Sequence, residues 1–177
     1  CAFNEMNAEI VGVIANHEVL RHLVEQFNVP FHYVPHADKA RETHEQEMLE
    51  IARTYDPAYL VLAKYMRILT PGFVEPYEGR IINIHHSFLP AFIGAKPYHQ
   101  AYERGVKIIG ATAHFVNNDL DEGPIIEQQV NKIGHQMGPK AMAFAGKDIE
   151  KIVLAKALNL VLNDRVFVSG NKTIIFE

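Results

Sequence analysis

Cysteine and tryptophan are almost missing from this chain, which has one cysteine, Cys1, and no tryptophan among its 177 residues. A single cysteine cannot form an internal disulfide or a multi-cysteine zinc site, so the fold must depend on a packed hydrophobic core. Proteins without disulfides are typical of reducing compartments, and we therefore expect a cytoplasmic protein.

Positive charge and long apolar runs are lacking as well. The 17 Lys and Arg residues are outnumbered by 21 Asp and Glu residues, for a formal net charge of -4. This balance gives no electrostatic reason to bind nucleic acid or an anionic membrane. The apolar runs fall short of the ~18 residues that a membrane span needs. We therefore expect a globular domain with neither nucleic acid nor a membrane as partner.

Short β-branched runs alternate with amphipathic stretches along the chain, and this pattern predicts an α/β fold. Strands are predicted at residues 8–15, 58–63, 80–85, 107–116 and 125–133. Helices are predicted at residues 16–27, 38–55, 97–104 and 147–163, the second with a highly charged outer face. The alternation favours one domain with a mostly parallel twisted sheet and helices on both faces. A C-terminal β-hairpin is predicted around Gly170.

The segment INIHHSFLPAF, from Ile82 to Phe92, places polar residues where a buried strand ends. Side chains alternate along a strand, so Asn83 and His85 point the same way. An amide among isoleucines is costly to bury unless another group uses it. Either residue alone is more simply a hydrogen-bonded core or strand-end residue. The pair favours a functional site, because α/β sheets bind ligands at the carboxyl ends of their strands.

A second polar loop, NNDLDEGP, follows the strand predicted at residues 107–116. Asp119 and Asp121 precede Gly123-Pro124, and aspartates before such a pair are common turn formers. A carboxylate held by a tight turn at this edge could also orient an imidazole or accept a proton from water. Both interpretations stay open at the level of the residues alone.

Metal and nucleotide motifs are not recognisable in the sequence. The chain has ten histidines, but His85 and His86 are adjacent and diverge in a strand, and no His-x-x-x-His on a predicted helix and no cysteine pair accompanies them. Neither a Gly-x-Gly-x-x-Gly fingerprint nor a Walker loop is present. We therefore expect no metal and no bound cofactor.

Three segments taken together resemble the folate-dependent formyltransferase family. The catalytic asparagine and histidine of that family stand in Asn-x-His, here Asn83-Ile84-His85, and its aspartate precedes a Gly-Pro turn, here Asp121 in DLDEGP. Its folate pocket uses a segment matched here by MRIL, residues 66–69. Within the family, NIHHSFLPAF, GAKPYHQAYERGVKIIGATAH and NKTIIF are most similar to the formyltetrahydrofolate deformylases. The formyltransferases typically have proline where His86 stands.

The resemblance implies a Rossmann-type, formyltransferase-like fold that hydrolyses 10-formyltetrahydrofolate to tetrahydrofolate and formate, which would feed one-carbon and purine metabolism. It implies that Asn83, His85 and Asp121 are catalytic, and it leaves open which of the last two is the base. The folate would be substrate rather than cofactor. The residues implied for its pocket are Met66, Arg67, Ile68, Leu69, Ile81, Val116, Asn117, Asn118 and Leu120.

Two alternatives remain beside this reading. One is a formyltransferase that formylates a small amine such as glycinamide ribonucleotide, and the other is a folate-binding module without catalysis. Deformylases also carry an N-terminal ACT-type regulatory domain and a first strand and helix. We expect residues 1–177 to be the catalytic domain without them. We also expect a homo-oligomer, because the C-terminal hairpin RVFVSGNKTIIF could pair with a second subunit.

Overall fold

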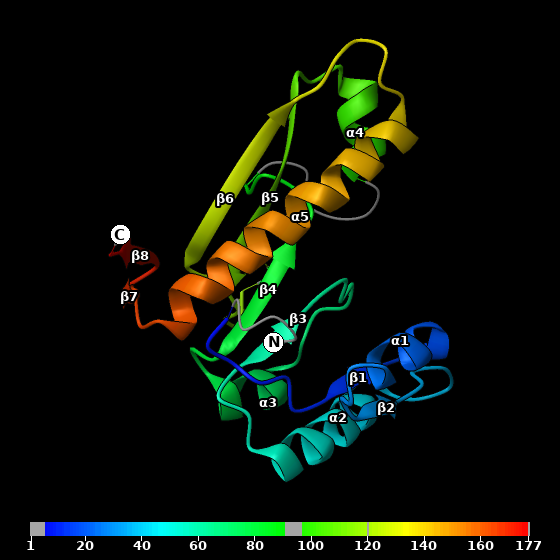
Figure 1. Ribbon diagram of the computed structural model, residues 1–177, viewed down its shortest axis with the longest axis vertical. Coiled ribbons are helices and arrows are strands. Elements are labelled where there is room, and N and C mark those ends of the chain that lie inside the picture. Colours follow the sequence, from blue (N-terminus) through cyan, green and yellow to red (C-terminus); the bar gives the residue numbers. More distant parts are fainter. Residues whose placement is uncertain (1–5, 91–96, 120, 177) are drawn as a thin grey trace.

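The computed structural model describes residues 6–90, 97–119 and 121–176, which form an α/β fold (Figure 1). Its strands are β1 (Val13–Ala15), β2 (Phe31–Tyr33), β3 (Leu60–Leu62), β4 (Ile81–His85), β5 (Ile108–Phe115), β6 (Ile125–Lys132), β7 (Val166–Ser169) and β8 (Lys172–Ile175). Its α-helices are α1 (Arg21–Glu25), α2 (Arg41–Tyr55), α3 (Pro71–Val74), α4 (Pro97–Arg104) and α5 (Pro139–Leu162). Two 3-10 turns cover Glu18–Leu20 and Glu75–Tyr77. The predicted α/β class and the C-terminal hairpin are confirmed.

The four-stranded sheet, of order β3-β4-β5-β6, is mixed, and in this detail it differs from the mostly parallel sheet that was expected. β3 and β4 are parallel, whereas β5 runs antiparallel to both β4 and β6. β1 and β2 form a separate parallel pair. Hydrophobic periodicity identifies strands but not their direction. Here the turn that contains Gly123 and Pro124 reverses the chain, so β5 and β6 form a hairpin.

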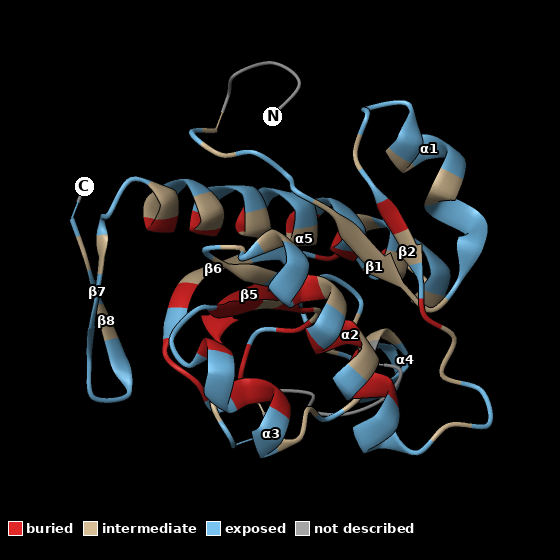
Figure 2. Cartoon of the chain, turned by 90° about the horizontal axis from the view of Figure 1, so that it is seen from below, coloured by how far each residue is buried: buried red, intermediate tan, exposed pale blue. Residues whose placement is uncertain are grey.

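Hydrophobic cores lie on both faces of this sheet. On one face α5 packs against β4, β5 and β6 through a buried stripe that includes Ile149, Val153 and Ala157. On the other face α2 and α3 pack against the β3–β4 side through residues such as Leu49 and Phe73. Figure 2 shows the buried residues of α5 turned towards the sheet, with α2 and α3 on the opposite side. The predicted covering of both faces by helices is therefore observed.

The N-terminal segment packs differently from the rest of the chain. The helix predicted at residues 16–27 is the short 3-10 turn followed by α1, and neither contains a buried residue. Val19 is 89% exposed and Phe27 56% exposed. Periodicity thus located helical structure here but did not show whether its apolar side chains are covered.

A membrane-crossing helix would need a long stretch with little charge. Across the described residues, α5 included, no helix meets both requirements.

Candidate active site

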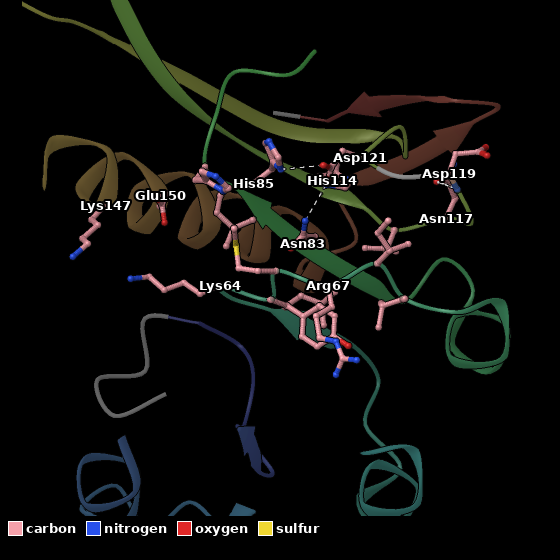
Figure 3. A pocket seen from close by; sticks show the side chains of 18 of the residues that line it. Lys64, Arg67, Asn83, His85, His114, Asn117, Asp119, Asp121, Lys147 and Glu150 are labelled. Atoms are coloured by element: carbon pink, nitrogen blue, oxygen red, sulfur yellow. Dashed lines mark hydrogen bonds and ion pairs between the residues drawn. The ribbon is translucent and has the colours of Figure 1, made fainter. Parts of the chain in front are cut away.

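A cavity of about 540 Å³ lies beside the carboxyl end of β4 (Figure 3). Its volume is within the range of about 300–1,000 Å³ that small-molecule sites occupy. It is lined by residues 64–69 after β3, residues 83–86 at the end of β4 and residues 116–119 after β5, with Leu62, Tyr98, His114, Asp121, Ala143, Lys147 and Glu150. The polar residues that the sequence placed at two strand ends therefore share one cavity.

Asn83 is oriented by a histidine on the neighbouring strand. The two strands pair so that Asn83 lies opposite His114, with the amide Nδ2 3.3 Å from the ring Nε2. The other ring nitrogen of His114, Nδ1, lies 2.8 Å from the carbonyl oxygen of Phe115, which assigns the ring proton to Nδ1. Burial lowers the pKa of His114, so the ring is neutral and Nε2 accepts from Asn83. The second N–H of the Asn83 amide is left to serve the cavity.

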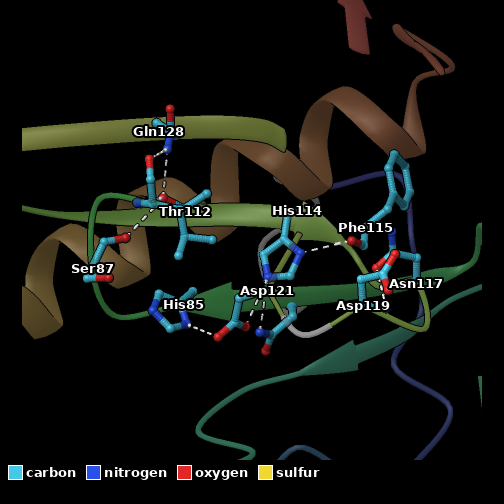
Figure 4. Close-up of polar contacts among 11 residues, drawn as sticks. His85, Ser87, Thr112, His114, Phe115, Asn117, Asp119, Asp121 and Gln128 are labelled. Carbon is cyan, nitrogen blue, oxygen red and sulfur yellow. Dashed lines mark hydrogen bonds and ion pairs between the residues drawn. The ribbon is translucent and has the colours of Figure 1, made fainter. Parts of the chain in front are cut away.

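His85 and Asp121 form the second polar pair of the site. His85 Nδ1 lies 3.4 Å from Asp121 Oδ2 (Figure 4). Hydrogen bonding to His85, opposed by partial burial, lowers the pKa of Asp121, so this carboxyl group is ionised at neutral pH. The other ring nitrogen, His85 Nε2, is buried and has no hydrogen-bond partner. A buried polar group without a hydrogen bond costs about 1–3 kcal/mol. A ligand that forms a hydrogen bond with Nε2 would remove this cost.

Asp121 is positioned by a turn that depends on glycine. Its φ of 55° is in the left-handed region, which aspartate tolerates better than most residues. A Cβ added at Gly123 would lie 1.8 Å from the carbonyl oxygen of Phe115, so only glycine allows the turn to pack against β5. Phe115 N–H donates to the carbonyl of Pro124 at 2.9 Å. Of the two aspartates in this loop, Asp121 faces His85, whereas Asp119 is exposed and its N–H closes a local turn.

The chain that follows His85 is fixed to the sheet by Thr112, a wholly buried residue of β5. The Thr112 hydroxyl donates to the carbonyl of Ser87 at 2.9 Å and accepts from Leu89 N–H at 3.1 Å (Figure 4). It also accepts from the Gln128 amide at 2.9 Å. One donor and two acceptor positions use the full capacity of a hydroxyl. The bend after β4 is thus fixed, and with it the direction of His85.

The loop 64–70 forms another wall of the cavity and carries the MRIL segment. Met66 is 65% exposed and Ile68 49% exposed, so apolar side chains stand open at this wall. The loop is anchored by Glu45, a buried residue of α2, which accepts from Thr70 N–H at 3.1 Å and from the Thr70 hydroxyl. Burial and the charge of Glu45 raise the pKa of Tyr65 to about 12. The loop is therefore anchored at Thr70, whereas its apolar side chains remain exposed to the cavity.

Seven of the nine residues predicted to line a folate pocket do line this cavity. They are Met66, Arg67, Ile68, Leu69, Val116, Asn117 and Asn118. Ile81 does not line it, since it is wholly buried and packs with Phe73 and Leu49 in the core beneath β4. The family resemblance implied Ile81 as a pocket residue, but in this structure its side chain belongs to the core. Leu120 lies outside the described residues.

Several cavity residues were not predicted as site residues. His114 was interpreted as a hydrogen-bonded core residue, and its contact with Asn83 depends on a strand pairing that one strand alone does not reveal. Lys147 and Glu150 come from α5, about sixty residues beyond His85 along the chain. Within the described ranges, no cluster of three or more His, Cys, Asp or Glu residues has the arrangement of a metal site.

Comparison with known proteins gives one consistent result. Residues 1–158 match the sequence model of the formyl transferase family. A formyltetrahydrofolate deformylase of Haemophilus influenzae is 58% identical over 173 residues, which is 98% of this chain and 62% of that protein. One from Bacillus subtilis is 56% identical over 170 residues, 96% of this chain and 57% of that protein. This chain thus spans about three fifths of the length of these curated relatives.

Solved structures agree with the sequence comparisons. A formyltetrahydrofolate deformylase from Pseudomonas syringae superposes with a TM-score of 0.96 at 46% identity, over 99% of this chain and 59% of that one. Glycinamide ribonucleotide transformylase 1 from Symbiobacterium toebii superposes with a TM-score of 0.94 at 27% identity, over 100% of this chain and 85% of that one. The fold is shared by hydrolases and transferases, whereas the higher identity is with the hydrolases.

Proposed function

Because the chain belongs to the formyl transferase family, we propose that it hydrolyses 10-formyltetrahydrofolate to tetrahydrofolate and formate. The observation that carries this proposal is the convergence of Asn83, His85 and Asp121 on one cavity, with the buried Nε2 of His85 left without a partner. Hydrolysis is favoured over transfer because deformylases are up to 58% identical to this chain, against 27% for the transformylase described above.

The geometry supports a mechanism in which water attacks the formyl carbon and negative charge develops on the formyl oxygen. The N–H of Asn83 and an N–H at Nε2 of His85 are the donors for that oxygen. One preorganised donor of this kind is worth about 2.7–4 kcal/mol of barrier. The Asp121 carboxylate accepts from Nδ1–H of His85 and so fixes the orientation of the ring. The Asp121–His85 pair takes one proton from the attacking water and passes it to N10 as the bond from the formyl carbon to N10 breaks, and the formic acid so formed loses its remaining acidic proton to solvent.

The folate itself is assigned to the wall formed by the loop 64–70 and residues 116–118. The exposed side chains of Met66 and Ile68 offer an apolar surface to a flat heterocycle, and the backbone at the ends of β3 and β5 offers donors and acceptors for its edge. Arg67 Nη1 is buried and has no hydrogen-bond partner, which suits a contact with a bound ligand.

The proposal includes a setting for the enzyme. Formate released in the cytoplasm would feed one-carbon and purine metabolism, and residues 1–177 would be the catalytic part of the protein. A homo-oligomer is proposed because the hairpin β7–β8 presents Phe167 and Phe176, each 59% exposed, on its surface. Exposed aromatic residues beside strand edges favour pairing with another subunit.

The decisive experiment is a formate-release assay on 10-formyltetrahydrofolate, run with and without glycinamide ribonucleotide. We expect formate and tetrahydrofolate in equal amounts without any amine, and no change when the amine is added. Formyl transfer to glycinamide ribonucleotide with no formate release in its absence would establish the transferase alternative. Tight folate binding without either product would establish the non-catalytic alternative.

A further inference from the structure

The cavity has a second end, formed by α4 and α5, that the proposed folate wall does not use. Figure 3 shows Lys147 and Glu150 on one side of His85, with Asn117 and Asp119 on the other side. If the folate lies along residues 64–69 and 116–118, the formyl carbon sits near His85 and the second reactant must approach from the α4–α5 end. The side chains at this end therefore decide which nucleophile arrives.

A continuous series of side chains lines this end. The ring of His86 stacks on that of His85, with centroids 4.9 Å apart and an angle of 28° between the planes. Tyr98 of α4 lies against His86 at a centroid distance of 6.4 Å. The Tyr98 hydroxyl donates to Glu150 Oε1 of α5 at 2.9 Å. From the reacting centre to α5, the wall consists of His86, Tyr98 and Glu150.

A glycine in α5, Gly146, leaves the space that the Tyr98 ring occupies. A Cβ added at Gly146 of α5 would lie 1.9 Å from the Tyr98 hydroxyl oxygen, so any larger residue would displace the ring. Glycine inside a helix costs about 0.8–1.0 kcal/mol relative to alanine. Gly146 is buried in the middle turns of α5, where that cost is not offset by a turn or a cap. The Tyr98 ring is therefore inserted into α5 rather than laid over it.

The protonation states of this wall suit a barrier rather than a second catalytic group. Burial, strengthened by the charge of Glu150, raises the pKa of Tyr98, so the hydroxyl remains a donor. Burial, together with repulsion from His85, lowers the pKa of His86, so its ring is neutral where it stacks on the ring of His85. Lys147 is exposed beside this wall and disfavours an approaching ammonium group.

We propose that His86 and the Tyr98–Glu150 pair determine nucleophile specificity, because they form the wall of the cavity end through which an amine would reach the formyl carbon. This inference rests on the proposed hydrolase function and deepens it. Water is small enough to pass, whereas an amine with several heavy atoms is not. Where an amine does enter, its nitrogen bonds to the formyl carbon, the bond from that carbon to N10 breaks, and the proton lost by the amine ends on N10. The products are a formamide and tetrahydrofolate.

The test measures how the formyl group divides between water and glycinamide, used as a small amine. The protein is incubated with 10-formyltetrahydrofolate and increasing glycinamide, and formate and N-formylglycinamide are both quantified. The wild-type chain is expected to give formate alone. His86→Ala and Tyr98→Ala are expected to raise the ratio of N-formylglycinamide to formate at least about tenfold above the wild-type detection limit. Tyr102→Ala, an exposed position on the same helix, is the matched control and should leave the ratio at the wild-type value.

The readout is a gained product, which damage to the fold cannot produce. Tyr98→Phe keeps the ring and loses only the hydrogen bond to Glu150, so it remains informative if Tyr98→Ala does not fold. It should raise the same ratio by a smaller factor. The inference is overturned if His86→Ala and the folded Tyr98 variant bind folate and release formate but never form N-formylglycinamide. Absence of formate release by the wild-type chain would instead remove the proposed function itself.

Discussion

Two regions meet at the cavity and are built in opposite ways. The sheet end, which comprises Asn83, His85, His114 and Asp121, is drawn from paired strands and a glycine-dependent turn. Its side chains are mostly buried and contact one another over 3.3–3.8 Å. The loop 64–70 exposes apolar side chains and is attached to α2 through Glu45.

Under the proposed function, this difference separates the residues that carry out the chemistry from those that bind the folate. Groups that stabilise a transition state must be held within a fraction of an ångström, and strands provide that rigidity. A surface that accepts a large flat ligand benefits from side chains that can adjust to it. Substitutions in the sheet end should therefore change turnover, whereas substitutions in the loop 64–70 should change affinity.

The largest expected effect is the loss of His85. In His85→Ala, both the Nε2 donor and the partner of Asp121 disappear, so kcat should fall by about 10²–10⁴-fold. Folate affinity, measured by fluorescence quenching or calorimetry, should stay within about threefold of the wild type, because His85 contributes little ground-state contact. Met66→Ala is the counterpart in the loop and should weaken affinity with kcat nearly unchanged. Near-normal formate release by His85→Ala would show that the sheet end does not control turnover.

A smaller but still large effect is expected for Gly123→Ala. The added methyl group overlaps the Phe115 carbonyl, so the turn must move and carry Asp121 away from His85. We expect kcat to fall by about 10²-fold, with a loss of about 1–3 kcal/mol in the free energy of unfolding measured in urea. Gly134→Ala is the control, since a Cβ there meets nothing within 4 Å. Equal effects of the two substitutions would show that the turn does not position Asp121.

On the binding side, Glu45→Ala should act through affinity alone. The substitution leaves Thr70 N–H without its acceptor and frees one end of the loop 64–70, at a cost of about 1 kcal/mol in binding. Folate Kd or KM should then rise about fivefold while kcat changes little. Glu50→Ala, at an exposed position of the same helix, should leave both unchanged. A fall in kcat at constant affinity would place Glu45 with the sheet end instead.

The sequence predicted the features that depend on neighbouring residues, and it did not predict the contacts between distant ones. Strand alternation placed Asn83 and His85 on one side, and local periodicity located β4 and α4, because these signals are short-range. The contact between Asn83 and His114 joins residues 31 positions apart and depends on strand register, which periodicity does not encode. Asp121 could be separated from Asp119 only through the family resemblance, since both stand in the same turn-forming context.

Glu45 shows a second limit. The charged pattern of α2 was interpreted as an outer face, yet Glu45 is buried beneath the loop 64–70 because Thr70 satisfies its carboxylate. A single charge among many exposed ones carries no local signal that it will find such a partner. The exposed apolar residues of α1 show the converse, since apolar periodicity there gave no buried face.

The smallest expected effect is a pH dependence of stability that belongs to the sheet end and not to the loop. Burial lowers the pKa of His114 below its ordinary value of 6.5. The unfolded chain therefore binds more protons at this residue than the folded chain does in the interval between the two values. Stability contributed by neutral His114 is complete above about pH 6.5 and is lost as pH falls towards the lowered value.

Urea unfolding between pH 7.5 and pH 5 should show this loss of stability. His114→Gln, whose amide oxygen can still accept from Asn83, should make the free energy of unfolding depend less on pH. Glu50→Ala should keep the wild-type slope, and an unchanged slope in His114→Gln would show that His114 is not the titrating group.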